Sequence, residues 1–196
     1  MEMPMKSWDA LPDSVLKRSG TVSGAFSAAG VFDYRSAARH VRDLAYGRNS
    51  DRNDSLSVLR EGRGTCSTKH ALLARLAMEQ ELPINLVIGI YEMNGRNTPG
   101  VGKVLARYGL TVIPEAHCYL TYAGDRVDVT RNISSAGPSE RFLHEERISP
   151  DQIGAYKTAI HQAFIHDWLV YKGTDHPLKF DQIWKVREEC IAAIGE

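Results

Sequence analysis

The spacing of apolar residues divides the first third of the chain into a loose arm and short helices. Residues 1–31 are rich in Gly, Ser and Ala and carry no regular apolar period, so we expect an irregular arm there. Apolar residues recur three and four positions apart over residues 34–44, which predicts a helix that Gly47 is placed to stop. A polar loop follows, and a short helix is expected at residues 55–60.

The next helix and the strand behind it give the strongest pattern. Thr65 is placed to N-cap a helix that begins at Cys66 and runs to about Gln80, and Pro83 closes it. Residues 84–93 are almost continuously apolar, which is typical of a strand buried on both faces. The sequence therefore predicts a buried helix leading directly into a buried strand.

A β-hairpin is predicted over residues 116–130. A two-residue turn at Ala123 and Gly124 fits this stretch, because Gly124 supplies the positive φ that such turns need. In that register His117 and Asp128 lie on the same face of the sheet, within side-chain reach. A turn with an odd number of residues would put them on opposite faces.

Two helices are predicted in the C-terminal quarter. Ser149, Pro150 and Gln152 match an N-cap, a first helical proline and a capping-box residue, so a long helix is expected to begin there and to end near Gly173. A last helix is expected over residues 181–194. The expected connections before them are a loop at 94–103, a short helix at 103–109, a strand at 110–113 and a polar stretch at 132–147. Helices, then a small sheet, then helices indicate the α+β class.

The composition excludes several classes of protein. Of the 196 residues 43% are apolar and 24% charged, and Lys and Arg balance Asp and Glu at 24 each, so neither nucleic acid nor membrane is expected as a partner. No apolar run is long enough to span a bilayer, and the first twelve residues lack the apolar region of a signal peptide. The three cysteines show no disulfide-scaffold spacing. We therefore expect a cytoplasmic protein with free thiols.

Cys66 is the candidate nucleophile. A thiol in the first turn of a helix is close to free backbone N–H groups and to the positive end of the helix dipole, both of which stabilise a thiolate. His117 and Asp128 supply a base and a carboxylate to orient it. Cysteine is also among the most buried residue types, so Cys66 as an inert core residue is the alternative. Gly62 and Gly64, which allow close approach of the backbone, favour the functional interpretation.

Two blocks of this sequence carry a family resemblance. Gly64-Thr65-Cys66 at a helix start, followed by a proline-containing turn and a buried strand, resembles the core of the transglutaminase-like superfamily of papain-fold cysteine enzymes. The second block is similar in outline: His117 has an aromatic residue two positions on, and Asp128-Val129-Thr130 stands where the family often has Asp-Pro-Thr. The resemblance covers residues 55–131.

The resemblance implies a papain-like core in which a nucleophile helix packs on a small antiparallel sheet. It implies Cys66 as the nucleophile, His117 as the base and Asp128 as its orienter, with acyl transfer from an amide or ester carbonyl through a thioester. The substrate would be a peptide, a protein or a small amide or ester, with no cofactor and no metal. The expected domains are an N-terminal arm (1–33), a transglutaminase-like core (34–147) and a C-terminal helical extension packed on it (148–196).

Three alternatives stay open. The chain could be a catalytically silent module of this fold that binds a protein or peptide. A zinc site could use the cysteines and histidines Cys66, His70, His117 and Cys118. Against this, His117 and Cys118 are neighbours on the expected strand and therefore point to opposite faces. A phosphate-binding loop at residues 97–104 lies between a strand and a helix, but lacks the first glycine and the hydroxyl for Mg²⁺. Trp8 is a candidate second oxyanion donor beside the Cys66 backbone N–H.

Overall fold

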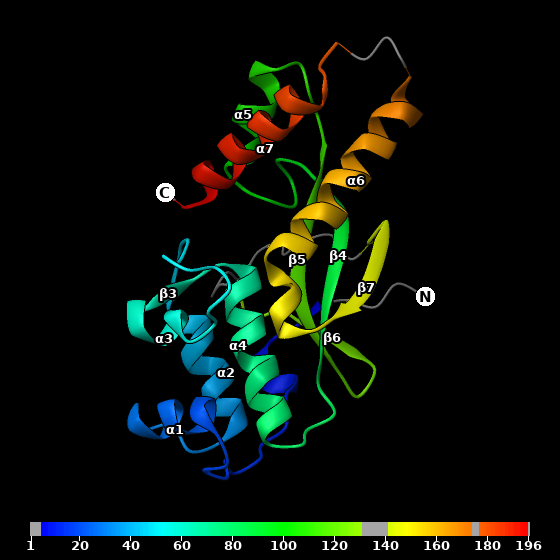
Figure 1. The fold of residues 1–196 in the computed structure, drawn as a ribbon. Helices are drawn as coiled ribbons and strands as arrows, with labels where there is room; N and C mark the ends of the chain where they lie inside the picture. Colours follow the sequence, from blue (N-terminus) through cyan, green and yellow to red (C-terminus); the bar gives the residue numbers. More distant parts are fainter. Residues whose placement is uncertain (1–4, 131–140, 174–176, 196) are drawn as a thin grey trace. The chain divides into compact units, whose positions relative to one another are not determined.

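The structure is a computed structural model that describes residues 5–130, 141–173 and 177–195, and these residues form an α+β fold (Figure 1). The strands are β1 (Met5–Lys6), β2 (Ala45–Tyr46), β3 (Arg63–Gly64), β4 (Asn85–Met93), β5 (Ile113–Tyr122), β6 (Asp125–Val127) and β7 (His144–Ile148). The helices are α1 (Thr21–Ala28), α2 (Tyr34–Asp43), α3 (Ser57–Glu61), α4 (Cys66–Glu79), α5 (Val101–Arg107), α6 (Ala155–Lys172) and α7 (Phe180–Gly195), with 3₁₀ turns η1 (Trp8–Ala10) and η2 (Pro150–Ile153).

The main sheet has the strand order β1-β6-β5-β4-β7 and is mixed, so the expectation of an antiparallel sheet is wrong at its β1 edge. Strand β1 pairs parallel to β6, whereas β5 and β6 are antiparallel. A second sheet consists of β2 and β3 in parallel.

The described residues divide into two compact units, each assembled from separate stretches of sequence. The first contains residues 5–88, 118–130 and 146–154, and the second contains the remaining described residues, 89–117, 141–145, 155–173 and 177–195. Strands β4, β5 and β7 run from one unit into the other.

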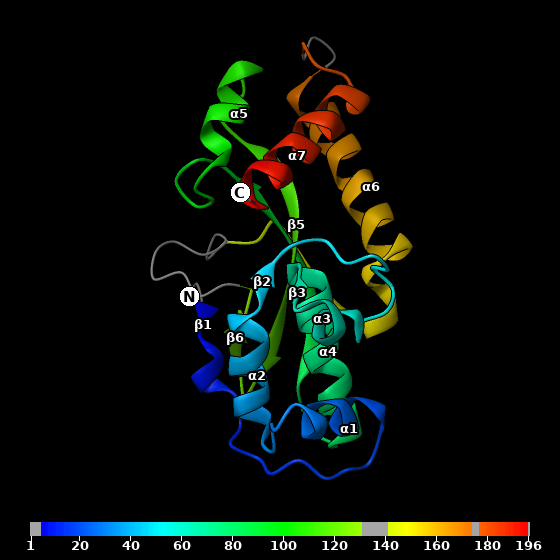
Figure 2. The ribbon, with the colours of Figure 1, turned by 90° about the vertical axis from the view of Figure 1, so that its left-hand side faces the viewer.

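Helix α4 is the central element of the first unit (Figure 2). It packs against α1, α2 and η2, and nine of its residues are buried. Its second half, from Ala71 to Ala77, supplies the apolar side chains of this burial, which is why the sequence predicts a buried helix here. The Tyr34 hydroxyl of α2 donates a hydrogen bond of 2.8 Å to the carbonyl of Leu73, and this bond fixes the two helices together.

The expectation of an irregular arm is wrong for Thr21–Ala28, which forms helix α1. The carboxylate of Glu79, at the end of α4, accepts hydrogen bonds from the backbone N–H groups of Val22 (2.8 Å) and Ser23 (2.7 Å). Orphan N–H groups at a helix start need such acceptors. Gly20 makes room, because a Cβ at that position would collide with the Glu79 carboxylate.

The predicted hairpin is confirmed in its turn and register. Ala123 and Gly124 have φ values of 50° and 89°, as expected for a two-residue turn with positive φ at both positions. Tyr122 pairs with Asp125, and Leu120 pairs with Val127. If this register is continued by one pair, Asp128 comes opposite Tyr119, so Asp128 and His117 belong to the same face of the hairpin, as the two-residue turn predicts.

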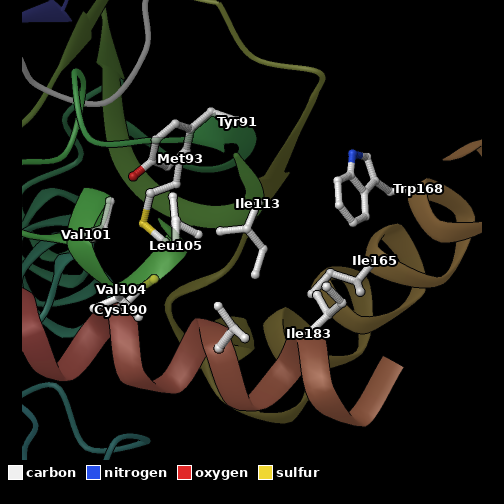
Figure 3. Close-up of a cluster of buried hydrophobic side chains, with 11 residues drawn as sticks. Tyr91, Met93, Val101, Val104, Leu105, Ile113, Ile165, Trp168, Ile183 and Cys190 are labelled. Carbon is white, nitrogen blue, oxygen red and sulfur yellow. The ribbon is translucent and has the colours of Figure 1, made fainter. Parts of the chain in front are cut away.

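The second unit has its own apolar core. Side chains from β4, α5, β5, α6 and α7 point toward one another in Figure 3, where Met93, Leu105, Ile113 and Cys190 are fully buried or nearly so. Helix α7 packs against both α5 and α6 (Figure 1).

Three other elements differ from expectation. The helix expected to begin after Ser149 is split, because Pro150–Ile153 is a 3₁₀ turn and α6 begins at Ala155. The expected strand at 110–113 begins only at Ile113. Part of the polar stretch at 132–147 forms strand β7, and residues 131–140 lie outside the described part of the chain. Helix α6 ends before Gly173, as predicted.

Among the helices that the structure describes, none has the length and apolar character to cross a membrane.

Candidate functional site

Cys66 is the first residue of α4, and its helix start is well capped. The Thr65 hydroxyl accepts from the Thr68 backbone N–H at 3.4 Å, and the Thr68 hydroxyl accepts from the Thr65 N–H at 3.0 Å. This is the predicted N-cap with a reciprocal partner three residues on. The Cys66 side chain is partly exposed, and its Sγ lies 3.8 Å from the Ser67 hydroxyl.

The two glycines before Cys66 serve different purposes. Gly62 ends α3 with a φ of 64°, in the left-handed region that favours glycine. Gly64 is buried, and a Cβ there would lie 2.9 Å from the Thr68 hydroxyl oxygen and 3.0 Å from side-chain carbons of Lys69 and Val58. The close approach expected from the sequence is therefore present at Gly64.

Lys69 is a completely buried cation one turn into α4. Its ammonium group donates to three backbone carbonyls, those of Arg42 (3.2 Å), Leu44 (2.7 Å) and Thr130 (3.0 Å). Three acceptors match the three N–H donors of a lysine, which offsets the cost of burying the charge. Lys69 thus connects α4 to the end of α2 and to the segment after β6.

His70, the next residue, is also completely buried and uses both ring nitrogens. Nδ1 lies 2.7 Å from the carbonyl oxygen of Cys66, so Nδ1–H donates this bond. Nε2 accepts from the backbone N–H of Val129 at 2.9 Å and lies 3.5 Å from Oδ1 of Asp128. These partners define a neutral imidazole with its proton on Nδ1.

Asp128 directly follows β6 and is held by its own loop. Its Oδ1 accepts from the Thr130 backbone N–H at 2.7 Å and from the Thr130 hydroxyl at 2.5 Å. Its backbone N–H donates to the Lys6 carbonyl at 3.1 Å. The carboxylate therefore has a fixed orientation at the end of the hairpin.

His117 lies on β5 in the second unit and is 7% exposed. The His117 and Tyr91 rings form a T-shaped pair, with centroids 6.4 Å apart and an interplanar angle of 83°. Cys66 and Asp128 belong to the first unit. The complete Cys66, His117 and Asp128 triad stays a prediction.

The other two cysteines differ from Cys66. All three thiols are free, as the sequence predicted, but Cys118 and Cys190 are buried. Burial, reinforced by the charges of Glu115 and Glu189, raises the pKa of the Cys190 thiol to about 11. A thiol in such surroundings is a poor nucleophile at neutral pH.

The contacts of His70 bear on the zinc alternative. Both its nitrogens already have backbone partners, so His70 has no lone pair to offer a metal. Within the described ranges, no cluster of three or more Asp, Glu, His or Cys side chains is arranged to hold a metal ion.

The 97–104 loop uses its polar groups internally. Asn97 accepts from the Asn94 backbone N–H at 2.9 Å and donates to the Glu92 carbonyl at 2.8 Å. Helix α5 then begins at Val101. These bonds favour a structural role for the loop over phosphate binding.

Trp8 packs beside two cations. The guanidinium groups of Arg39 and Arg42 lie 5.8 and 5.2 Å from the centre of the indole ring. The role of Trp8 as an oxyanion donor stays a prediction.

Sequence reasoning missed the structural roles of Lys69 and His70. A signal was present, since the buried residues that follow them on the helix, from Ala71 to Ala77, are all apolar. A charged residue at such a position requires buried partners. The partners are backbone groups, however, and these leave no mark in the sequence.

No family model, no curated protein and no solved structure matches this chain.

Proposed function

We propose that this protein is a cysteine-dependent acyl-transfer enzyme of the transglutaminase-like type, acting on an amide or ester carbonyl. The observation that carries the proposal is the position of Cys66. It is the one cysteine of three that is partly exposed, and it begins a long, capped helix. Free N–H groups and the helix dipole at this position stabilise a thiolate.

In the proposed reaction His117 takes the proton from the Cys66 thiol, and the thiolate sulfur forms a bond to the carbonyl carbon. The bond to the leaving amine or alcohol then breaks, and the leaving group takes the proton from the imidazolium. Water or an amine attacks the thioester, returns a proton to His117 and releases the thiolate. The Cys66 backbone N–H is one donor to the oxyanion.

Asp128 orients the His117 imidazole in this proposal. Support comes from the β5–β6 register, which is the one that such an arrangement requires. Further support comes from the bonds that hold the Asp128 carboxylate in one orientation. A papain-like arrangement of α4 and the hairpin is part of the proposal. We place the activity in the cytoplasm, because reducing conditions keep a nucleophilic cysteine as a thiol.

Acylation by an activated aryl ester tests the proposal. We expect a single acyl group on the peptide that contains Cys66, found by mass spectrometry, and none after Cys66→Ala. Ser67→Ala, which removes the neighbouring hydroxyl, is the matched control and should acylate normally. His117→Ala should slow acylation, since loss of a general base typically costs ~10²–10⁴-fold. Acylation that persists unchanged in Cys66→Ala would overturn the proposal, because the acyl group would then be on another residue. A wild-type protein whose Cys66 is not acylated would overturn it in favour of a silent binding module.

A further inference from the structure

The segment 128–130 is attached to α4 by two consecutive buried side chains. Lys69 donates to the carbonyl of Thr130 at 3.0 Å, and His70 accepts from the N–H of Val129 at 2.9 Å. Both side chains are completely buried. The position of this segment against the helix is therefore set by hydrogen bonds to two buried side chains, and burial of the side chains strengthens such bonds.

Of the two, His70 also reaches back to the candidate nucleophile. Its Nδ1–H donates to the carbonyl of Cys66 at 2.7 Å, while Nε2 holds the residue next to Asp128. One rigid imidazole ring thus joins the backbone of residue 66 to the backbone of residue 129. The distance between these two points is fixed by the size of the ring.

We propose that His70 is a positioning residue, which holds Asp128 at the place required for Cys66 chemistry. This inference rests on the proposed function, in which Asp128 orients the base. His70 acts through Asp128 and forms no bond to the substrate. The bond to Val129 is the one that matters for Asp128, and the bond to Cys66 anchors the ring.

Two amide substitutions separate these bonds. In His70→Asn the amide nitrogen takes the place of Nδ1 and can still donate to Cys66, but the side chain is too short to accept from Val129. In His70→Gln the longer side chain brings its amide oxygen to the place of Nε2, where it accepts from Val129. Both variants are uncharged, polar and close in size, so each is the control for the other.

The measurement is the rate constant for alkylation of Cys66 by iodoacetamide at pH 6, followed by peptide mapping. We expect His70→Asn to slow the reaction as much as Asp128→Asn does, roughly 10- to 100-fold, a typical cost of losing a supporting partner. His70→Gln should react near the wild-type rate. The double variant His70→Asn with Asp128→Asn should react no more slowly than either single variant, because both remove the same function.

Three outcomes overturn the inference while leaving the proposed function intact. These are a wild-type rate in His70→Asn, an equal loss in His70→Gln, and additive losses in the double variant. If wild-type Cys66 reacts no faster than Cys66 in Asp128→Asn, the proposed function fails and the inference fails with it.

A measurement on the unmodified protein covers the case in which His70→Asn does not fold. The nitrogen chemical shifts of the His70 ring distinguish the two neutral tautomers. We expect the proton on Nδ1, which leaves Nε2 to accept from Val129. A proton on Nε2 would exclude the bond to Val129 and overturn the inference.

Discussion

At the scale of single residues, the start of α4 is packed so closely around Gly64 that a side chain there would collide with its neighbours. Gly64 is buried against Thr68, Lys69 and Val58, and the two following residues cap and begin the helix. The geometry of Cys66 therefore depends on a residue that has no side chain.

Gly64→Ala should disturb this start. The added methyl group would lie closer than van der Waals contact to three side chains. Overpacking of this kind typically lowers the free energy of unfolding by ~1–3 kcal/mol. Alkylation of Cys66 should slow as well. Chemical denaturation and peptide mapping measure the two effects.

Gly24→Ala is the matched control, since a Cβ on this exposed glycine of α1 meets nothing within 4 Å. Alanine in a helix interior is favoured over glycine by roughly 0.5–1 kcal/mol, so this variant should be slightly more stable. Equal effects of the two substitutions would contradict the close approach described at Gly64.

At the scale of elements, the sequence predicts those whose signals are local. The bounds of α4 and the β5–β6 turn follow from Thr65, Pro83 and Gly124, which act on their own neighbours. Helix α1 could not be predicted, because Glu79, far along the chain, caps it. Within the candidate site, the start of α4 at Cys66 could be predicted because its N-cap, Thr65, is the preceding residue. The buried contacts of Lys69 and His70 could not be predicted, because their partners are backbone groups of Thr130 and Val129, far along the chain.

Glu79→Gln tests this account of α1. The change removes the negative charge that two N–H groups and the helix dipole share, so a loss of ~0.5–2 kcal/mol is expected. Hydrogen exchange at Val22 and Ser23 should become faster. Glu81→Gln is the control, an exposed carboxylate two residues on, and should leave exchange in α1 unchanged. Unchanged protection in Glu79→Gln would show that α1 does not depend on this cap.

At the scale of the whole molecule, the compact units interleave along the sequence. The domain division expected from the sequence, with an arm at 1–33, a core at 34–147 and an extension at 148–196, stays a prediction. A linear pattern cannot indicate that residues 89–117 share a core with α6 and α7. Such grouping depends on long-range contacts, among them the pair of Glu115 on β5 with Arg187 on α7.

The Glu115–Arg187 pair predicts how stability changes with pH. Burial alone would raise the pKa of Glu115, but the charges of Arg187, His161 and Lys157 and the two Arg187 hydrogen bonds outweigh it and hold the pKa at about 2. Because this lies below the ordinary value of 4.5, the stabilisation is present above pH 4.5 and is lost as the pH falls toward 2. Burial lowers the pKa of His161, so stability also decreases as the pH falls below 6.5.

Glu115→Gln should flatten the pH dependence of the free energy of unfolding between pH 4.5 and 2. It should also destabilise the protein at pH 7, by ~3–5 kcal/mol, because Arg187 loses its buried partner and keeps only the more exposed Glu188. Glu188→Gln removes a more exposed carboxylate from the same Arg187, and should cost only ~0–1 kcal/mol. Denaturant titrations across the pH range measure both. A similar small loss in the two variants would contradict the role given to the buried pair.

The central claim is that Cys66 is an activated thiol, and limited alkylation with iodoacetamide near pH 6 tests it most directly. At that pH an ordinary thiol is almost entirely protonated, so only a stabilised thiolate reacts quickly. Peptide mapping should find the label on Cys66 first, with buried Cys118 and Cys190 unlabelled until the protein unfolds. Substituting His117 by Ala should bring Cys66 down to the rate of an ordinary thiol. Equal labelling of the three cysteines in the folded protein, or a Cys66 rate that does not depend on His117, would contradict the account.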